Sequence, residues 1–168
     1  VDQTKEIIKA KNADAENIDE IAKEVGIGAV IFQELSNSRI KDYVFSWDKV
    51  LNFDGETGPY VQYTNARAAS VLNNAGESII QKAMDVKNID VKYICGDSSY
   101  ELVKLLYKFP EAIVDAGEKY EPSIMTRHII DMAQAFNRFY HDEHILVKNE
   151  DEKIAKETIS KNFFPLKC

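Results

Sequence analysis

The sequence predicts an all-α protein, and three observations lead to this fold class. Apolar residues recur at helical spacing along most of the 168-residue chain, so that each stretch has one face to bury. Serine, asparagine, glycine and proline separate these stretches where helices would begin and end. Residues 85–97 alternate apolar and polar side chains as a strand would, but no partner strand is visible, so we expect a loop there.

Length and composition describe an ordinary globular chain. A content of 45% hydrophobic and 29% charged residues suits one domain, with or without an attached arm. No apolar run approaches the roughly 18 residues of a membrane span, and no signal peptide opens the chain. Cys95 and Cys168 form no C-x-x-C pair, so we expect free thiols and a reducing compartment, the cytoplasm. The first residue, Val1 rather than Met, predicts a fragment of a longer protein.

Two helices are expected at the N-terminal end. Residues 2–11 have the pattern of a short polar helix, which is followed by a break. Asn17 precedes Glu20 by three residues, the spacing of a capping box at the start of the second helix. Gly26 and Gly28 interrupt the apolar spacing of that helix, which predicts a kink or a junction between two helices.

A third helix is predicted over about 38–50, and the chain then changes from a loop to a helix within residues 53–67. The apolar side of the third helix would consist of Ile40, Tyr43, Val44, Trp47 and Leu51. Pro59 suits the first turn of the next helix, because its missing N–H costs nothing there. We expect Asp54 and Glu56 to fix the loop and the helix start by accepting backbone N–H bonds, rather than to form a general-acid pair.

The helix that begins at Pro59 has two stripes instead of one. The apolar stripe consists of Val61, Ala68, Leu72 and Ala75. The second stripe lies roughly 100–120° around the helix and consists of Tyr60, Tyr63, Arg67 and Asn74. Two phenols and a guanidinium beside an acidic loop indicate either a recognition surface or an unusually polar packing face.

Further helices are expected in the second half of the chain. A short helix over 79–84 leads to the loop at 85–97. Ser98 and Glu101 have the spacing of a capping box, and the helix that they open should end before Pro110.

The last three helices are predicted from Pro110 to Gly117, over about 122–140, and over about 150–162. The core side of the long helix would consist of Ile124, Met125, Met132, Ala135, Phe136 and Phe139. The last of these helices is polar, and residues 162–168 do not continue it past Pro165. We predict no site at this C-terminal end.

Two motifs carry a resemblance to a known family. The run Phe53–Tyr63 with the following Asn65-Ala66-Arg67 resembles the segment of arginyl-tRNA synthetase that joins the catalytic region to the C-terminal anticodon-binding helical bundle. The run Ala133-Gln134-Ala135-Phe136-Asn137-Arg138-Phe139-Tyr140-His141-Asp142 is similar to a helix of the same family. The resemblance covers about residues 15–150.

The resemblance implies an antiparallel helical bundle of the class I synthetase anticodon-binding type over 53–168, with an N-terminal helical arm over 1–52 beside the catalytic domain. It implies a fragment of arginine–tRNA ligase that binds and positions the anticodon arm of arginine tRNA. The expected partners are this tRNA and the missing catalytic domain, and neither a membrane nor DNA.

The whole enzyme would use ATP, arginine and Mg²⁺, but the signatures of the ATP site are missing here. The sequence contains neither His-x-Gly-His nor Lys-Met-Ser-Lys-Ser, the class I signatures that the family carries upstream of this region. It also contains no Walker loop and no G-x-G-x-x-G. We therefore expect no catalytic residue and no cofactor site in this fragment, which would be inactive alone.

Five residues are the predicted tRNA contacts: Tyr60, Tyr63, Arg67, Asn137 and Tyr140. Tyrosine can stack on an unstacked base, and arginine can clamp a phosphate. The pattern alone is equally consistent with packing of Tyr60 and Arg67 against the next helix, and the resemblance favours RNA contact. The Asn137 amide could read a base edge or cap a neighbouring helix, and the pattern favours the structural role. For Tyr140 the two interpretations are even.

The remaining polar clusters point to structure rather than chemistry. His141 and His144 enclose two acidic residues, but a metal ion needs three or four convergent ligands, so a solvated turn is the favoured interpretation. His128 faces the apolar side of its helix, which is typical of a satisfied core histidine.

The net charge of −7 argues against a self-sufficient nucleic-acid binder, because phosphate contacts need clustered lysine and arginine. The alternative function is therefore an acidic helical protein–protein interaction module without RNA binding. Salt-dependent RNA affinity separates the two, because only a phosphate-reading surface loses binding steeply with salt. A stand-alone enzyme would require a catalytic cluster that the sequence does not offer.

Overall fold

The computed structural model describes residues 1–11, 17–85, 87 and 89–163, and every regular element in this part of the chain is helical. The elements are α1 (Asp2–Lys11), α2 (Ile18–Ser36), α3 (Trp47–Val50), α4 (Gly58–Ala75), α5 (Glu77–Lys82), the 3₁₀ turn η2 (Val91–Ile94), α6 (Asp97–Lys119), α7 (Ser123–Asp142) and α8 (Glu150–Phe163). The all-α prediction is confirmed. None of the described helices has both the length and the apolar character needed to cross a membrane.

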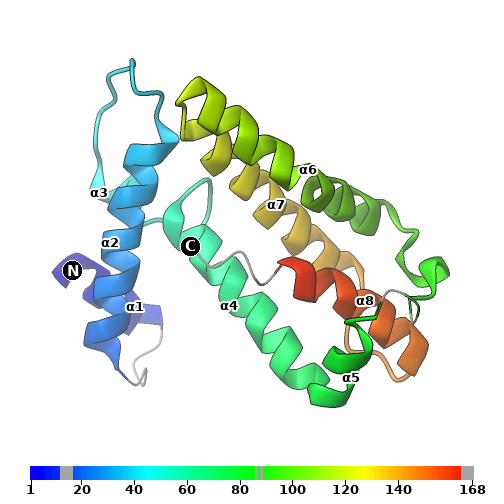
Figure 1. Cartoon of the computed structure of the whole chain (residues 1–168). Helices are drawn as coiled ribbons and strands as arrows, with labels where there is room; N and C mark the ends of the chain where they lie inside the picture. The colour runs from blue at the N-terminus through cyan, green and yellow to red at the C-terminus, as the bar shows by residue number, and fades with distance from the viewer. Residues whose placement is uncertain (12–16, 86, 88, 164–168) are drawn as a thin grey trace.

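The main core lies where α4, α6, α7 and α8 meet. The helices α6 and α7 form an antiparallel pair, and α8 packs on α4, α5 and α6 (Figure 1). The helices α1 and α2 lie at the other end of the molecule, where α2 packs on α4 and α7 (Figure 1). The buried residues of this core are Ala68, Val71, Leu102, Met132, Ala135, Phe136, Phe139, Ile145 and Ile159.

Helix α2 continues through Gly26 and Gly28 without a break, so of the two predicted alternatives the junction between two helices is wrong. Each of these glycines lies where another helix comes close: a Cβ atom on Gly26 would lie 2.8 Å from Oγ1 of Thr4, and one on Gly28 would lie 2.7 Å from Nε2 of Gln62.

Gly58 allows α4 to approach α2 closely. A Cβ atom on Gly58 of α4 would lie 3.0 Å from Cβ of Phe32 and 3.1 Å from Cα of Ala29, both on α2. Only a residue without a side chain allows the start of α4 to approach the α2 backbone this closely.

Replacing Gly58 with alanine is expected to lower the free energy of unfolding by about 1–3 kcal/mol, because the new methyl group would crowd backbone atoms of α2, and the two helices would have to move apart. Gly117→Ala is the matched control, because no atom of the described residues lies within 4 Å of a Cβ atom there. Within α6, that change should instead stabilise the protein by roughly 0.5–1 kcal/mol. Urea unfolding followed by circular dichroism checks both. Equal effects of the two substitutions would contradict the close approach.

The predicted helix over 38–50 is wrong except for its last turn, α3. The apolar side that predicted it is not buried, since Ile40 is 84% and Val44 is 89% exposed. An amphipathic helix is stabilised mainly by packing its apolar face. Because these side chains are not packed within the described part of the protein, the segment before α3 is irregular.

Neither predicted capping box forms. Asn17 has a left-handed backbone with φ 57°, and its side chain makes no capping hydrogen bond. Its carbonyl oxygen accepts the N–H of Glu20 at 3.0 Å instead. Helix α6 begins at Asp97, one residue before Ser98, and Gly96 occupies the N-cap position without a side chain to accept a bond. A capping box needs extended backbone at its first residue, which the spacing of residue types does not determine.

Helix α6 runs through Pro110 as one helix, whereas the sequence predicted two. Proline removes one backbone N–H and disfavours a helix interior. Here α6 packs along α7, and Nε2 of His128 on α7 lies 3.0 Å from the carbonyl oxygen of Leu105, just over a turn before the proline. Contacts with α7 therefore support both halves of α6. His128 lies part-buried between the helices, as expected for a structural histidine.

The start of α4 is capped by Thr57 rather than by the predicted carboxylates Asp54 and Glu56. The Thr57 side chain accepts the backbone N–H of Tyr60 at 3.2 Å. Glu56 instead pairs with Arg127 of α7, at 2.8 Å between Oε1 and Nη1. This cap sets where α4 begins, and therefore which of its side chains face α7.

Candidate nucleic-acid interface

All five predicted contact residues meet on the surface where α4 faces α7. Tyr60, Tyr63 and Arg67 come from α4, and Asn137 and Tyr140 come from α7. Residues three, four or seven apart lie on the same side of a helix. Packing of α4 on α7 turns these two sides toward each other.

Asn137 is the centre of this surface. Its amide nitrogen donates to the hydroxyl of Tyr60 and to the hydroxyl of Thr64, each at 2.9 Å. Its amide oxygen accepts a hydrogen bond from the guanidinium of Arg67. Thr64 is buried and donates to the carbonyl oxygen of Tyr60 at 2.9 Å. Both N–H donors of the amide and one lone pair of its oxygen are therefore used by neighbouring side chains, which supports the structural role that the pattern favoured for Asn137.

Arg67 lies between two tyrosine rings. Its guanidinium carbon is 4.8 Å from the centre of the Tyr63 ring and 5.1 Å from the centre of the Tyr140 ring. Both distances suit a cation–π contact. Both rings remain accessible, with Tyr63 52% and Tyr140 43% exposed. The arrangement presents two aromatic surfaces and one cation together, which is the chemistry that binds single-stranded nucleic acid.

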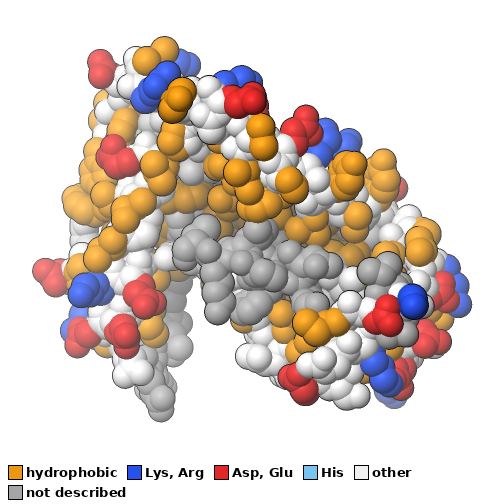
Figure 2. Space-filling view, in the orientation of Figure 1, with side chains coloured by type: hydrophobic (Ala, Val, Ile, Leu, Met, Phe, Trp, Pro, Cys, Tyr) orange, Lys and Arg blue, Asp and Glu red, His pale blue; other side chains and the backbone are white. Residues whose placement is uncertain are grey.

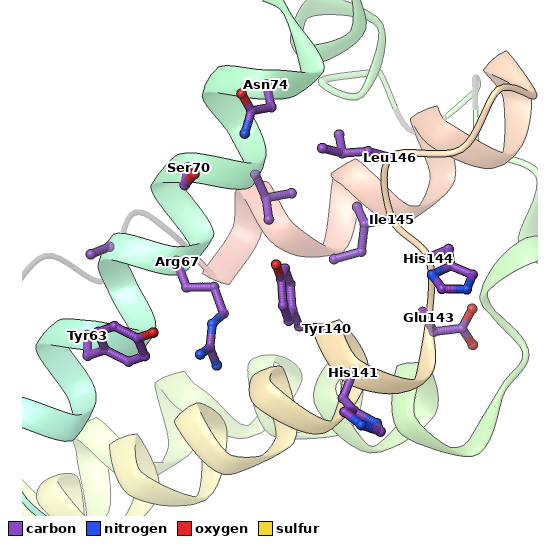
Figure 3. Close-up of a pocket in the computed structure, with 12 residues that line it drawn as sticks. Tyr63, Arg67, Ser70, Asn74, Tyr140, His141, Glu143, His144, Ile145 and Leu146 are labelled. Carbon is purple, nitrogen blue, oxygen red and sulfur yellow. The ribbon is translucent and has the colours of Figure 1, made fainter. Parts of the chain in front are cut away.

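Tyr63, Arg67 and Tyr140 open onto a hollow of about 740 Å³, which we call the groove. Tyr60 and Asn137 do not line it and face a second hollow beside it, which His141 also lines. One wall is α4, with Tyr63, Arg67, Ser70 and Asn74, and the other wall consists of Tyr140, His141 and the segment 143–146 that follows α7 (Figure 3). Ile145 and Leu146 point toward α4, whereas Glu143 points away from it (Figure 3).

Sequence reasoning missed part of this groove. Ser70 lies three residues after Arg67, so helical spacing could have placed it on the wall. Thr64 could have been found in the same way, four residues after Tyr60. No local signal places the segment 143–146, because only the tertiary structure brings it opposite α4.

The charge of the groove differs from that of the whole chain. Arg67 bonds to a neutral amide rather than to a carboxylate. Glu143 is the carboxylate among the described residues that line the groove, and its Oε2 lies 3.0 Å from Nζ of Lys156. His141 and His144 add imidazole rings that carry positive charge when protonated. The net charge of −7 is therefore no measure of the local field that a phosphate would meet.

The two histidines next to the groove do not gather with other ligands. Nδ1 of His141 lies 3.2 Å from Oδ1 of Asp142, its neighbour in the chain. In the described part of the protein, no group of three or more His, Cys, Asp or Glu residues could hold a metal ion.

A helical bundle with an aromatic and basic groove fits the class of RNA-binding domains that read unpaired loops. Residues 61–161 match the family model described as DALR anticodon binding domain, and the chain belongs to this family. Residues 1–47 match a second model, described as tRNA synthetases class I (R), catalytic domain. The resemblance to arginyl-tRNA synthetase that the two motifs indicated is thereby confirmed.

Similar curated proteins are arginine–tRNA ligases. The chain is 54% identical to that of Halothermothrix orenii over 93% of its own length. It is 52% identical to that of Clostridioides difficile, also over 93% of its length. In both cases it spans 26% of the relative, so it corresponds to about a quarter of these proteins.

Solved structures share the fold. The arginyl-tRNA synthetase of Thermus thermophilus superposes with a TM-score of 0.84 at 27% identity, over 96% of this chain and 27% of that one. The arginyl-tRNA synthetase of Plasmodium falciparum superposes with a TM-score of 0.76 over 98% of this chain and 29% of that one. At 20% identity the second likeness shows the fold alone.

Proposed function

We propose that this chain binds and positions the anticodon arm of an arginine tRNA through the groove between α4 and the end of α7. The observation that carries this proposal is the assembly of Tyr63, Arg67 and Tyr140 into one accessible stack, in a chain that belongs to an anticodon-binding family. The longer protein would use this contact in the ATP-dependent joining of arginine to tRNA during protein synthesis.

The groove offers separate groups for bases and for the backbone. Unstacked bases of the loop would stack on the exposed faces of Tyr63 and Tyr140, and Arg67 would pair with a phosphate or stack in turn. Tyr60 accepts a bond from Asn137, which leaves its own hydroxyl proton available for an RNA acceptor. Asn137 would act mainly by holding Tyr60 and Arg67 in place.

ATP, arginine and Mg²⁺ would bind elsewhere in the longer protein. The residues present do not fit these groups, because both class I signatures are missing from the sequence and the described residues offer no metal-binding cluster. We therefore assign no step of the ligation reaction to this chain. We propose that the arm comprises residues 1–52 and the bundle residues 53–168. We also propose that the longer protein acts in the cytoplasm.

The catalytic part of the longer protein would pack on α2. Figure 2 shows hydrophobic side chains along this helix, and Ile27, Ile31 and Leu35 are exposed at intervals of four residues on one face. An apolar stripe of this kind is typical of a surface that another domain covers. The match of residues 1–47 to a catalytic-domain model supports this placement.

Fluorescence anisotropy with a labelled anticodon stem-loop of an arginine tRNA tests the proposed function. We expect binding that weakens with salt, with a slope of about −0.7 in log K against log salt for each phosphate contact. A scrambled loop and a DNA loop of the same sequence should bind less tightly, because stacking geometry and the 2′-hydroxyl groups differ.

The protein–protein alternative predicts a different result. A well-folded chain without salt-sensitive binding at about 10–100 μM, where even non-specific nucleic-acid contacts register, would contradict the proposal for this chain. Testing the longer protein in the same assay then decides whether the catalytic part is needed for recognition. Absence of binding there as well would favour a protein-docking surface.

A further inference from the structure

Helix α8 places a lysine in the interior beside the groove. Lys156 is only 5% exposed, and a buried ammonium group must be paired and hydrogen-bonded to remain charged. Its Nζ lies 2.7 Å from Oε1 of Glu152, 3.0 Å from Oε2 of Glu143 and 3.3 Å from the carbonyl oxygen of His144. Two of these three partners belong to the segment that forms the far wall of the groove.

Glu143 connects three elements at this point. Its backbone N–H donates to the carbonyl oxygen of Phe139 at 2.9 Å and so ends α7. One carboxylate oxygen pairs with Lys156, and the other lies against the start of α6, where a Cβ atom on Gly96 would be 2.7 Å away. The carboxylate therefore fits between α8 and α6 only because residue 96 has no side chain.

Two carboxylates surround the one ammonium group at this site. Burial lowers the pKa of Lys156, while Glu152 and Glu143 raise it, and the net direction is upward, so the ammonium stays charged. The Glu143 and Glu152 side chains are each about a quarter exposed, at 22% and 27%. Replacing a buried ion pair with apolar groups often costs little stability, whereas removing one partner alone is destabilising, because the other charge is left unpaired. We call Lys156 with its two carboxylate partners the anchor. Its role is best explained by the groove wall that it holds in position.

We propose that Lys156 is a positioning residue for the groove: by holding Glu143 and the His144 carbonyl, it fixes the segment 144–146 opposite Arg67. Lys156 touches no RNA in this arrangement. The inference rests on the proposed function of the groove. It adds a residue that would influence RNA binding from behind the wall, without facing the groove.

Two variants test the anchor in different ways. Lys156→Met removes the ammonium group at similar volume. Gly96→Ala changes no charge, and its methyl group displaces only the flexible end of Glu143, so folding should persist. Lys156→Arg keeps the charge and can rejoin both carboxylates. The controls are Lys104→Met, which removes an exposed charge on α6, and Gly117→Ala, where a Cβ atom meets nothing within 4 Å.

For each variant, hydrogen exchange of the amides in 143–147 is measured first, without RNA. Lys156→Met and Gly96→Ala should speed this exchange. Anisotropy with the arginine anticodon stem-loop should then show about tenfold weaker binding for Lys156→Met and a smaller loss for Gly96→Ala. The salt slope should stay at the wild-type value, because no phosphate contact is lost. Lys156→Arg should restore most of the affinity, and the controls should match wild type.

The outcomes separate the two proposals. Wild-type affinity and wild-type exchange in Lys156→Met would overturn the positioning role. A slope of log K against log salt that is less steep in Lys156→Met by about one would overturn it too, because Lys156 would then contact a phosphate directly. If the wild-type chain binds no RNA, the proposed function fails for this chain, while faster exchange in the two variants still supports the anchor. If Lys156→Met does not fold, Gly96→Ala decides in the same way.

Discussion

Replacing Arg67 with alanine is expected to weaken binding of the arginine anticodon stem-loop by about 10- to 100-fold, the range for losing one stacked or bidentate contact. The substitution removes the only cation that lies between Tyr63 and Tyr140 among the described residues. It also leaves the Asn137 amide oxygen without its guanidinium donor. Tyr63 and Tyr140 would then lose the guanidinium that lies between them.

Salt dependence tells what kind of contact is lost. If Arg67 pairs with a phosphate, the negative slope of log K against log salt should become less steep in Arg67→Ala, by about 0.7–1. Arg67→Lys should keep most of that slope and still lose affinity, because an ammonium group cannot replace a planar guanidinium between two rings. Stem-loop anisotropy across a salt series measures both quantities.

Arg39→Ala is the charge-matched control, because Arg39 is exposed and does not line the groove. It should bind RNA nearly as wild type does. Thermal unfolding must show that each variant is folded at the assay temperature. Wild-type affinity in a folded Arg67→Ala protein would contradict the placement of the RNA on this groove.

Replacing Glu157 with leucine is expected to raise the free energy of unfolding by about 3 kcal/mol at about pH 8, and by much less at about pH 5. Glu157 lies on α8 and is fully buried, and neither carboxylate oxygen has a hydrogen-bond partner among the described residues. Burial raises the pKa of this carboxyl from its ordinary 4.5 to about 7, although the charge of Lys153 acts in the opposite direction.

The sign of this pH dependence follows from where each state holds the proton. Below the ordinary pKa of 4.5, both the folded and the unfolded protein bind the proton, and the group costs no ionisation energy. Between that value and the folded pKa of about 7, the unfolded chain loses its proton while the folded protein keeps it. Stability therefore falls as the pH rises through this window, and the loss is complete above it.

Urea unfolding of wild type and Glu157→Leu at several pH values measures the difference directly. Other carboxylates titrate equally in both proteins and cancel in the comparison. Glu118→Leu, an exposed position on α6, controls for the substitution itself. A constant difference for Glu157→Leu would show that its carboxyl is solvated or paired in the folded protein.

The sequence predicted those elements whose helical face packs on the core. The long helix expected over about 122–140 is Ser123–Asp142, and its predicted Met132, Phe136 and Phe139 are buried. Periodicity succeeds here because every turn of the helix repeats the same environment. It fails for 38–50, where Ile40 and Val44 stay exposed and the apolar stripe has nothing to pack on.

Helix α8 shows the opposite failure. Its sequence is polar, and its extent over Glu150–Phe163 agrees with the prediction of a final polar helix. Nevertheless, Lys156, Glu157 and Ser160 are buried, because α8 lies against α4 and α5 (Figure 1). Residue types predict which side chains of a helix are favourable to bury. Which side chains are in fact buried depends on the helices that pack against it.

The sequence by itself determined the fold class, the family, and the five side chains proposed to contact RNA, because helical spacing and short motifs are local properties. Only the tertiary structure decided that Arg67 lies between Tyr63 and Tyr140, that Asn137 holds it there, and that the segment 143–146 forms the opposite wall. These contacts join residues about 70 positions apart in the chain (Arg67 and Asn137). Their geometry follows from how α4, α7 and α8 pack on a shared core, and packing depends on all of the helices together.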